Sequence, residues 1–591
     1  MFQIVFFFER LLVNYFVVLL VMENSQINVP TWSKYLCAAI VSGAVIYVGG
    51  RLFLWSNDDN KNNKKVDISK YGKISENGKK GAQLKADGNE FFKSRDYTKA
   101  VETYLEAISL CDETLDRSLL AELHQNAAAS YNYLGDHEKE IEHCTMSLKF
   151  SPGFIKALKR RAAAYEKTRS LKNAGDDYLL LGSLEPKQAA TYQEKALEAY
   201  KSAAIIVADY KFKKLPEEAR PIGHQQMFAY LFHTSIHNPL ALYVRKKKDC
   251  SVLAEEPEVQ EVIQLLRDHK FDEAFEICEK YLSQFNFDTK KIEFYYLMEI
   301  LYLKCLIVQR RYTLAKSVYE EIENRYNNET VEIDEKYLND FMLTWKILGM
   351  ELNFRLANDE GEDFFNNKMG QYKENTDSYL NHGIFKISTS MSELAGNAEK
   401  AYALDNNNIY AMWYQYYGQC INSLMTGDYS CFLKKAHELE SKLKGYGYTE
   451  DSYIGWFFYS QVIAMDNYKE SSNILKECSK IYPKNVFNKI VDISTAANLE
   501  GTSSPESYLM YMLKVKKVIE DVFEVDKYNS AAFKLKARIL MEEGKTEEAK
   551  ECLDEALKYA STIDEYADVI LDSYLFKGSM NISEHRTPLV K

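Results

Sequence analysis

The chain has 591 residues and a formal net charge of −12, which leaves room for several domains and argues against a general nucleic-acid binder with a broad basic surface. It contains only 10 prolines and 25 glycines, and strand-like alternating runs bounded by turn residues are scarce. Its 10 cysteines form no Cys-x-x-Cys pair, so a zinc module or a disulfide framework is not expected and a reducing compartment fits better. We therefore predict an all-α protein.

The first helix expected along the chain is a membrane anchor. Residues 35–50 carry no charge, but sixteen helical residues span only about 24 Å of a hydrocarbon core about 30 Å thick. Continuing the helix through Trp55 closes this gap if the Arg51 side chain extends to the interface. We therefore expect residues 34–55 to form a single transmembrane helix, with a buried core helix as the alternative.

Two segments flank this predicted anchor. The N-terminal segment 1–33 begins with an apolar run over residues 1–22, which is interrupted by Glu9 and Arg10 and shows no small-residue cleavage site. This run is either a second hydrophobic segment or a stretch upstream of a start at Met22. Residues 56–81 are polar and rich in Lys and Asn, which predicts a flexible tether. Positive charge on this side of the anchor predicts that the remainder of the chain lies in the cytosol.

A repeat with a period near 34 residues organises residues 82–205. Each copy is expected to be a helix–turn–helix unit in which small residues lie where the two helices cross, while aromatic residues such as Phe91 and Tyr104 fill the adjacent space. The other positions that follow this register are Gly88, Ala100, Ala107, Ala128, Tyr131, Ser147, Pro152, Ala162, Tyr165, Ala174, Tyr178 and Pro186. Glu140 and Leu181 stand where a small residue is usual. The pattern is that of tetratricopeptide repeats, which stack into a superhelix with a concave groove.

Weaker copies of the same repeat recur in residues 256–575. The clearest of them occupies residues 531–557, whereas residues 322–398 contain helical patterns without a clear register. Residues 206–255 hold three prolines and no sustained helical period, so we expect them to form a junction between two arrays. Residues 576–591 are expected to be a tail.

Five polar residues of the first array are expected to converge on its concave side. Residues four apart share one helix face, which pairs Lys85 with Asn89 and Lys156 with Arg160, and Asn126 lies on the first helix of the middle repeat. Lys and Arg form charge-assisted hydrogen bonds to carboxylates, and Asn can pair with a peptide backbone. The set therefore predicts a site for a carboxylate-bearing peptide tail, with five unrelated surface residues as the alternative.

The type and spacing of these five residues resemble the two-carboxylate clamp of chaperone-binding tetratricopeptide domains. In that family the clamp grips the C-terminal Glu-Glu-Val-Asp of the cytosolic seventy- and ninety-kilodalton heat-shock chaperones. The neighbouring cations Lys159 and Arg161 do not belong to the resemblance, and we expect them to be ordinary solvated side chains.

The order of anchor, tether, clamp domain, junction and longer array is similar to that of the large, seventy-kilodalton tetratricopeptide receptor family of the mitochondrial outer-membrane translocase. The resemblance implies a single-pass outer-membrane import receptor with the bulk of the chain in the cytosol. It also implies partners: chaperones at the clamp, hydrophobic precursor proteins in the second array, and other translocase subunits that accept those precursors.

The resemblance implies a client-binding groove in the second array. Fitting the repeat register to the late copies directs first-helix positions towards the concave side, and these positions are Met412, Gln415, Tyr416, Trp456, Phe457, Lys534 and Arg538. Aromatic and Met side chains give adaptable apolar contacts, which suits a receptor for many sequences. The alternative is that these aromatic residues belong to the core, as aromatic residues of repeats usually do.

Sequence patterns for catalysis are missing. The chain has no phosphate-binding loop, His-Glu-x-x-His helix or nucleophile elbow, so we expect neither an enzyme nor a cofactor. His233 and His237 lie four residues apart but have no evident Cys or carboxylate partner, so no metal site is expected. Two other functions stay open: a clamp-type co-chaperone anchored at another membrane, such as the endoplasmic reticulum, and a scaffold that binds no chaperone.

Overall fold

The computed structural model describes residues 69–72, 74–215, 221–232, 237–249, 251, 253, 256–285, 292–328, 335–386, 391–464, 467–497 and 505–586. Within these ranges the regular secondary structure is entirely helical, as the composition predicts. Across the described ranges, no helix combines the length and apolarity that crossing a membrane requires. The predicted anchor at 34–55 and the segment 1–33 lie outside the described residues.

The chain divides into two compact units. The N-terminal unit contains the described residues up to Lys211 and, from the other end of the chain, the residues from Ala567 onwards. The central unit extends from Phe212 to Tyr566. The repeat pattern predicts a first array that ends at residue 205, close to this boundary, but it does not predict that the C-terminal helix returns to the first unit.

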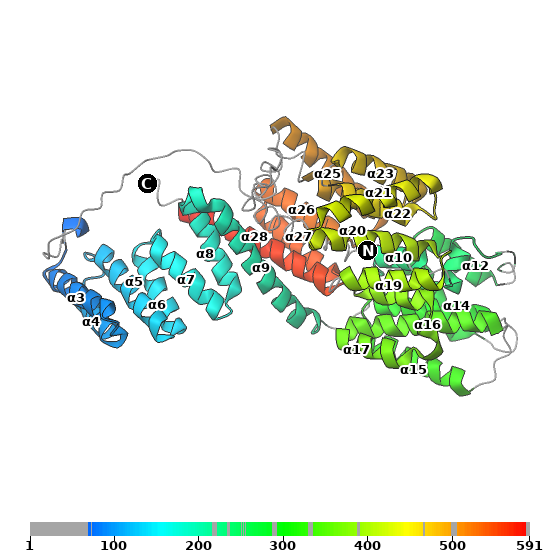
Figure 1. Ribbon diagram of the computed structural model, residues 1–591, viewed down its shortest axis with the longest axis horizontal. Helices are drawn as coiled ribbons and strands as arrows, with labels where there is room; N and C mark the ends of the chain where they lie inside the picture. The colour runs from blue at the N-terminus through cyan, green and yellow to red at the C-terminus, as the bar shows by residue number, and fades with distance from the viewer. Residues whose placement is uncertain are drawn as a thin grey trace. The chain divides into compact units, whose positions relative to one another are not determined.

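The N-terminal unit is built from successive antiparallel helix pairs (Figure 1). Its elements are η1 (Ser69–Tyr71), α3 (Glu76–Lys93), α4 (Tyr97–Leu110), α5 (Arg117–Leu134), α6 (His137–Phe150), α7 (Ile155–Lys167), α8 (Leu171–Leu184), η2 (Pro186–Gln188), α9 (Ala189–Phe212) and most of α28 (Ile563–Arg586). The pairs α3–α4, α5–α6 and α7–α8 correspond to the three predicted repeat copies.

Local sequence explains why each pair turns sharply and packs closely. Asp96 and Asp136 cap the second helices of the first two pairs, since their side chains accept hydrogen bonds from backbone amides three residues ahead. Gly88 faces Tyr104, and a Cβ atom at Gly88 would lie only 2.6 Å from the tyrosine ring. A glycine is therefore required where α3 crosses α4.

Helix α3 begins earlier than the tether predicted over 56–81. It starts at Glu76, where the Ser75 side chain caps it by accepting a hydrogen bond from the backbone amide of Gly78. A Cβ atom at Gly78 would lie 2.4 Å from Asp116, so this glycine permits close contact rather than flexibility. The low hydrophobicity of this stretch predicts no helix, but α3 forms here and packs through its small residues.

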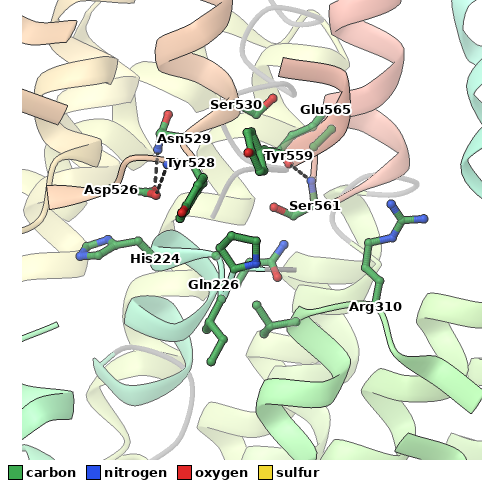
Figure 2. A pocket seen from close by; sticks show the side chains of 15 residues that line it. His224, Gln226, Arg310, Asp526, Tyr528, Asn529, Ser530, Tyr559, Ser561 and Glu565 are labelled. Atoms are coloured by element: carbon green, nitrogen blue, oxygen red, sulfur yellow. Dashed lines mark hydrogen bonds between the residues drawn. The ribbon is translucent and has the colours of Figure 1, made fainter. Parts of the chain in front are cut away.

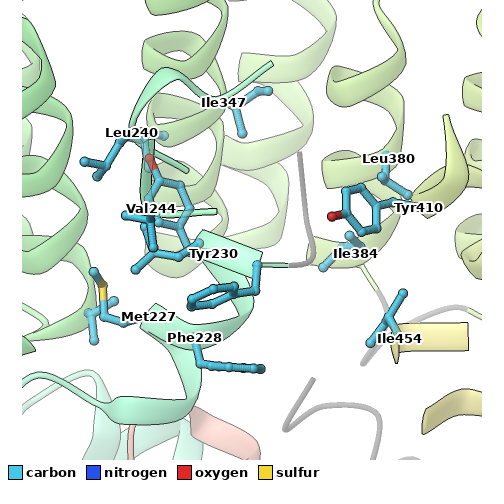
Figure 3. Packing of buried hydrophobic residues seen from close by; sticks show 14 of the residues in the cluster. Met227, Phe228, Tyr230, Leu240, Val244, Ile347, Leu380, Ile384, Tyr410 and Ile454 are labelled. Carbon is cyan, nitrogen blue, oxygen red and sulfur yellow. The ribbon is translucent and has the colours of Figure 1, made fainter. Parts of the chain in front are cut away.

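The central unit contains the remaining helices. They are α10 (His224–Phe232), α11 (Pro239–Val244), α12 (Pro257–Arg267), α13 (Phe271–Gln284), α14 (Ile292–Val308), α15 (Tyr312–Asn328), α16 (Glu335–Leu356), α17 (Asn358–Asp363), η4 (Phe364–Lys368), η5 (Gly370–Tyr372), α18 (Thr376–Phe385), α19 (Met391–Leu404), α20 (Ile409–Met425), α21 (Tyr429–Tyr446), α22 (Tyr453–Ile463), α23 (Tyr468–Ile481), α24 (Phe487–Ala497), α25 (Pro505–Val525), α26 (Ser530–Glu542) and α27 (Thr546–Tyr559). One large hydrophobic cluster connects helices α10 to α24 (Figure 3).

The segment predicted as an irregular junction supplies part of this core. Phe228 and Leu231 of α10 and Leu240 of α11 are completely buried in the cluster (Figure 3 labels Phe228 and Leu240). Pro239 starts α11 instead of breaking a helix, because proline fits the first helical turn and Asn238 caps it. Pro239 therefore marks a helix start, which the sequence pattern alone does not reveal.

The region without a clear repeat register contains one long helix and an irregular one. Helix α16 has 22 residues, and α17 continues into the π-helical turn η4. A π turn inserts an extra residue into the helical period, so the spacing of buried positions shifts across Phe364 to Lys368. This shift accounts for the loss of register within 322–398.

The C-terminal helix α28 completes the N-terminal unit. Tyr574 lies against Tyr200 of α9 with 5.8 Å between ring centroids, and Leu571 and Leu575 pack against the same apolar cluster. The residues predicted as a tail from 576 thus continue a helix as far as Arg586. Helix α28 crosses the predicted end of the second array at residue 575 without interruption.

Candidate functional site

The two predicted clamp amides meet between neighbouring repeats. Asn89 lies on α3 and Asn126 on α5, and the Nδ2 atom of Asn126 donates to Oδ1 of Asn89 at 3.0 Å. The hydroxyl of Tyr104 donates to the same oxygen at 2.7 Å. These two bonds fix the Asn89 amide, which leaves its Nδ2 group to donate to a ligand.

The α7 end of the predicted clamp carries two unpaired cations. Lys156 is exposed and Arg160 is half-buried, and neither has an ion-pair partner within the described ranges. The Nε–H group of Arg160 is buried and donates to no hydrogen-bond acceptor among the described residues. A guanidinium that is partly removed from water and lacks a counter-ion is suited to bind a carboxylate.

The neighbouring cations Lys159 and Arg161 have internal partners. Arg161 donates from Nε and Nη2 to the two carboxylate oxygens of Asp177 at 2.8 and 2.7 Å. Asp177 is buried, and burial raises its pKa although the Arg161 guanidinium opposes this rise. Lys159 forms a surface ion pair with Glu185 at 2.8 Å. The expectation of two ordinary solvated cations is therefore wrong for Arg161, because it neutralises a buried acid.

The α3 end of the predicted clamp is already occupied by a carboxylate of the protein itself. Lys85 forms an ion pair with Glu122 of α5, and its ammonium also donates to the hydroxyl of Tyr71 at 2.7 Å. The Tyr71 hydroxyl in turn donates to Glu122 at 2.5 Å. Lys70 donates to both oxygens of Glu122 at 2.9 Å. Glu122 thus accepts hydrogen bonds from three side chains at once.

This arrangement holds Glu122 as a carboxylate. Burial alone would raise the pKa of Glu122, but the hydrogen bonds from Lys85 and Tyr71 outweigh burial and lower the pKa to about 2. The group is therefore ionised at every physiological pH. Lys85 faces a permanent internal anion, whereas Arg160 faces none.

Sequence reasoning missed Glu122 and Tyr71. Glu122 lies one helical turn before Asn126, so the spacing of four residues signals that both share a face of α5. The contact of Tyr71 has no comparable signal, because it depends on how the 3₁₀ turn η1 folds back onto the helices.

Comparisons with known proteins now add to this geometry. No protein-family model matches the chain. The mitochondrial import receptor subunit TOM70 of Homo sapiens is 32% identical over 144 residues, which cover 22% of this chain and 23% of that protein. The TOM70 of Rattus norvegicus is 28% identical over 203 residues, which cover 33% of each chain. The chain is similar to the TOM70 import receptors.

The similarity confirms the resemblance to the large tetratricopeptide import-receptor family. The matched stretches of the TOM70-like chain span about a quarter to a third of the length of these two TOM70 relatives. Protein PHOX3 of Arabidopsis thaliana is 31% identical over 144 residues, which cover 24% of this chain and 18% of PHOX3. The crystal structure of yeast Tom70 aligns with a TM-score of 0.43 and 17% identity, over 87% of this chain and 98% of that one.

The residues predicted for the client groove of the TOM70-like chain differ in exposure. Phe457 is completely buried, which is the core position that the sequence left as an alternative. Met412, Trp456 and Lys534 are also buried. Gln415 and Tyr416 are partly exposed and Arg538 is exposed. Only these last three present substantial side-chain surface to a client in this conformation.

Trp456 has a defined structural position. Its indole nitrogen donates to the backbone carbonyl of Gly447 at 2.7 Å, and its ring stacks on Tyr448 with centroids 4.4 Å apart. Tyr448 is 41% exposed and lies in a loop that the repeat register did not include among the groove positions. The aromatic surface here therefore belongs to Tyr448, with Trp456 beneath it.

A small pocket of the TOM70-like chain lies within the central unit (Figure 2). Its volume of about 40 Å³ has room for one or two water molecules. Asp526 accepts a hydrogen bond from Asn529 at 3.0 Å, and Glu565 accepts one from the backbone amide of Ser561 at 2.5 Å. Burial raises the pKa of Asp526 to about 6 and that of Glu565 to about 7. The pocket is too small for a peptide segment.

Metal ligands do not gather in the part of the chain that the structure describes. That part contains no group of three or more His, Cys, Asp or Glu side chains arranged to hold a metal ion. The Nδ1 atom of His237 lies 3.0 Å from a carboxylate oxygen of the buried Asp377, whereas His233 falls outside the described residues.

Proposed function

We propose that the protein is an import receptor of the mitochondrial outer membrane that docks cytosolic heat-shock chaperones and receives hydrophobic precursor proteins from them. Its similarity to TOM70 supports the import role. The observation that carries the docking role is the pair of unpaired cations, Lys156 and Arg160, on the same array as the Asn89–Asn126 contact. In this proposal the receptor is a single-pass protein, most of which lies in the cytosol, and it passes precursors to other translocase subunits.

The clamp recognises the Glu-Glu-Val-Asp tail of the seventy- and ninety-kilodalton chaperones. Lys156 and Arg160 bind tail carboxylates, because neither has an ion-pair partner among the described residues and Arg160 is partly desolvated. The free Nδ2 group of Asn89 donates to a carboxylate or backbone carbonyl of the tail. Salt weakens binding, since the site is open to water.

The experiment that tests docking compares Arg160→Ala with Lys159→Ala. Losing one charge-assisted hydrogen bond costs about 1.5–3 kcal/mol, so Arg160→Ala should weaken binding of a Glu-Glu-Val-Asp peptide roughly tenfold to a hundredfold. Lys159→Ala removes the same charge from the same helix but breaks the surface pair with Glu185 and a contact with the Tyr192 ring, so it should change the affinity less than about twofold. Fluorescence anisotropy with the labelled peptide measures both. Equal affinities of Arg160→Ala and the unaltered protein would overturn the clamp.

Client binding is proposed for the surface that includes Gln415, Tyr416 and Arg538. Their exposure supports this choice, while the buried Met412, Trp456, Phe457 and Lys534 contribute through packing beneath the surface. Tyr416→Ala should therefore reduce capture of a hydrophobic carrier precursor without lowering the melting temperature. Full capture by a well-folded Tyr416→Ala protein would place the client elsewhere.

Location separates this proposal from the alternative of a co-chaperone at the endoplasmic reticulum. The full chain with a C-terminal fluorescent protein should colocalise with a mitochondrial outer-membrane marker. Protease added to intact mitochondria should then release the fluorescent part. A reticular pattern would favour the co-chaperone, and a protected fluorescent part would refute the cytosolic orientation.

A further inference from the structure

We infer that Glu122 and the segment Ser69–Tyr71 form an internal gate that occupies the Lys85 end of the clamp and must be displaced when a peptide tail binds there. This inference rests on the proposed clamp. The gate is the carboxylate of Glu122 held by the side chains of Lys70, Tyr71 and Lys85.

The contacts show that the gate is a closed network. The Glu122 carboxylate receives hydrogen bonds from two ammonium groups and one hydroxyl, which are the donors that a tail carboxylate would seek. The ammonium of Lys70 also lies 4.6 Å from the centroid of the Tyr71 ring. Only 14% of the Lys85 side chain is exposed, so an incoming carboxylate finds this cation covered.

The α7 end of the clamp differs from the Lys85 end, which Glu122 occupies. In the part of the chain that the structure describes, neither Arg160 nor Lys156 pairs with an acid, so that end of the clamp is ready for a ligand. Full engagement of a tail requires that Lys85 exchange Glu122 for a ligand carboxylate. Because only the open fraction of molecules is competent for that exchange, the apparent affinity is reduced by this fraction.

The gate is attached directly to the start of α3. Ser75, four residues after η1 ends and one before α3 begins, donates from its backbone amide and hydroxyl to Asp116 at 2.8 and 2.6 Å. Gly72 adopts a left-handed conformation with a φ of 70°, which lets the chain turn between η1 and this anchor point. Release of η1 therefore leaves the capped start of α3 in place.

The decisive variant is Glu122→Gln, which keeps the side-chain shape and removes the internal anion. It should bind a Glu-Glu-Val-Asp peptide roughly tenfold more tightly, since Lys85 becomes available to the ligand. Glu76→Gln is the matched control, because it removes the same charge from an exposed residue whose ion pair among the described residues is with Lys79. The control should stay within about twofold of the unaltered protein.

Two further variants test whether the effect passes through Lys85. In a Lys85→Ala background, Glu122→Gln should give no gain, because the cation that the gate covers is gone. Tyr71→Phe removes one donor to Glu122 while keeping the ring, so it should strengthen peptide binding by a smaller factor. Circular dichroism establishes whether each variant is folded. If Glu122→Gln does not fold, Tyr71→Phe still tests the gate.

The outcomes distinguish failure of the gate from failure of the clamp. If Arg160→Ala weakens binding but Glu122→Gln equals the unaltered protein, the clamp stands and the gate is overturned. Weaker binding by Glu122→Gln would also overturn the gate, because Glu122 would then position Lys85 for the ligand. If neither the unaltered protein nor any gate variant binds the peptide, the clamp and the gate are both overturned.

Discussion

The cores of the two units are built from different kinds of side chain. Between α3, α4 and α5 of the N-terminal unit, the buried cluster consists mainly of alanine and leucine around Tyr104. The cluster of the central unit instead contains many aromatic rings, among them the completely buried Trp345 and Trp413. Small side chains let the helices of the N-terminal unit cross closely. In the central unit, large rings fill the space between the helices. Phe457, which is predicted to face the groove, is one of these buried rings.

The largest effect expected from this comparison is the loss of a core tryptophan. Trp345→Ala should lower the free energy of unfolding by about 3–5 kcal/mol, because Trp345 is completely buried and stacks between Tyr319 and Phe341. Chemical denaturation measures the loss, and hydrogen exchange should report it in α16. Trp345→Phe serves as a control with a smaller loss. An unchanged free energy of unfolding would show that the aromatic cluster is not tightly packed.

A second prediction contrasts the stability effects of removing two adjacent arginines, Arg160 and Arg161. Arg161→Ala leaves the buried Asp177 without its partner and should cost about 3 kcal/mol of stability, whereas Arg160→Ala should cost almost none. Thermal unfolding of both variants measures the difference. The double variant Arg161→Met with Asp177→Leu should recover most of the loss, since an apolar pair removes the buried charge. Equal losses in the two single variants would contradict the assignment.

A third prediction concerns pH, because each unit contains a pair of contacting histidines that are at least partly buried. The Nδ1 atoms of His124 and His143 lie 3.0 Å apart in the N-terminal unit, and His224 and His269 make a similar contact in the central unit. Burial lowers the pKa of His124 to about 4 and that of His269 to about 4.

The sign of the pH effect follows from these lowered values. Below pH 6.5 the unfolded chain binds protons that the folded histidines reject, so stability present above pH 6.5 is lost as the pH falls towards 4. Each such histidine contributes a slope of up to about 1.4 kcal/mol per pH unit. Denaturation midpoints measured between pH 7 and 4.5 should fall accordingly, and His124→Gln should flatten the slope. Parallel slopes for the variant and the unaltered protein would exclude His124 as a source.

The smallest predicted effects compare two glycines. Gly88→Ala should cost about 1–3 kcal/mol, because its Cβ atom would lie 2.6 Å from the ring of Tyr104. Gly396→Ala, within α19, places its Cβ atom where no atom lies within 4 Å. It should therefore stabilise the central unit by up to about 1 kcal/mol through helix propensity. A neutral Gly88→Ala variant would mean that Tyr104 can move aside at little cost.

The helices and the first three repeats could be predicted because their signals are local. The match of Gly88 to Tyr104 operates within one repeat, so spacing alone reveals it, and the helix caps Asp96 and Asp136 are equally local. The repeat register of the central unit could not be predicted throughout. The π turn at 364–368 shifts the helical period, and aromatic residues stand where small residues are usual. The return of α28 to the first unit is a long-range contact, which no local pattern encodes.

The candidate site divides in the same way. The Asn89–Asn126 contact could be predicted, because it follows from helix periodicity and the offset between repeats. The pairing of Lys85 with Glu122 could not, since it depends on where Tyr71 of η1 lies in space. Arg161 and Arg160 are neighbours of the same residue type, and only the tertiary position of Asp177 separates their roles.

The return of α28 has a consequence for the order in which the protein is made. Leu571, Tyr574 and Leu575 complete the cluster that contains Tyr200, but the ribosome synthesises the central unit before it reaches them. At about 5–20 residues per second, the roughly 350 residues from Phe212 to Tyr566 take roughly 20 to 70 s to translate. During that time the apolar face around Tyr200 has no cover from its own chain. The first unit to emerge from the ribosome is therefore the last to close, so a nascent chain of this protein exposes an apolar face until α28 has been made.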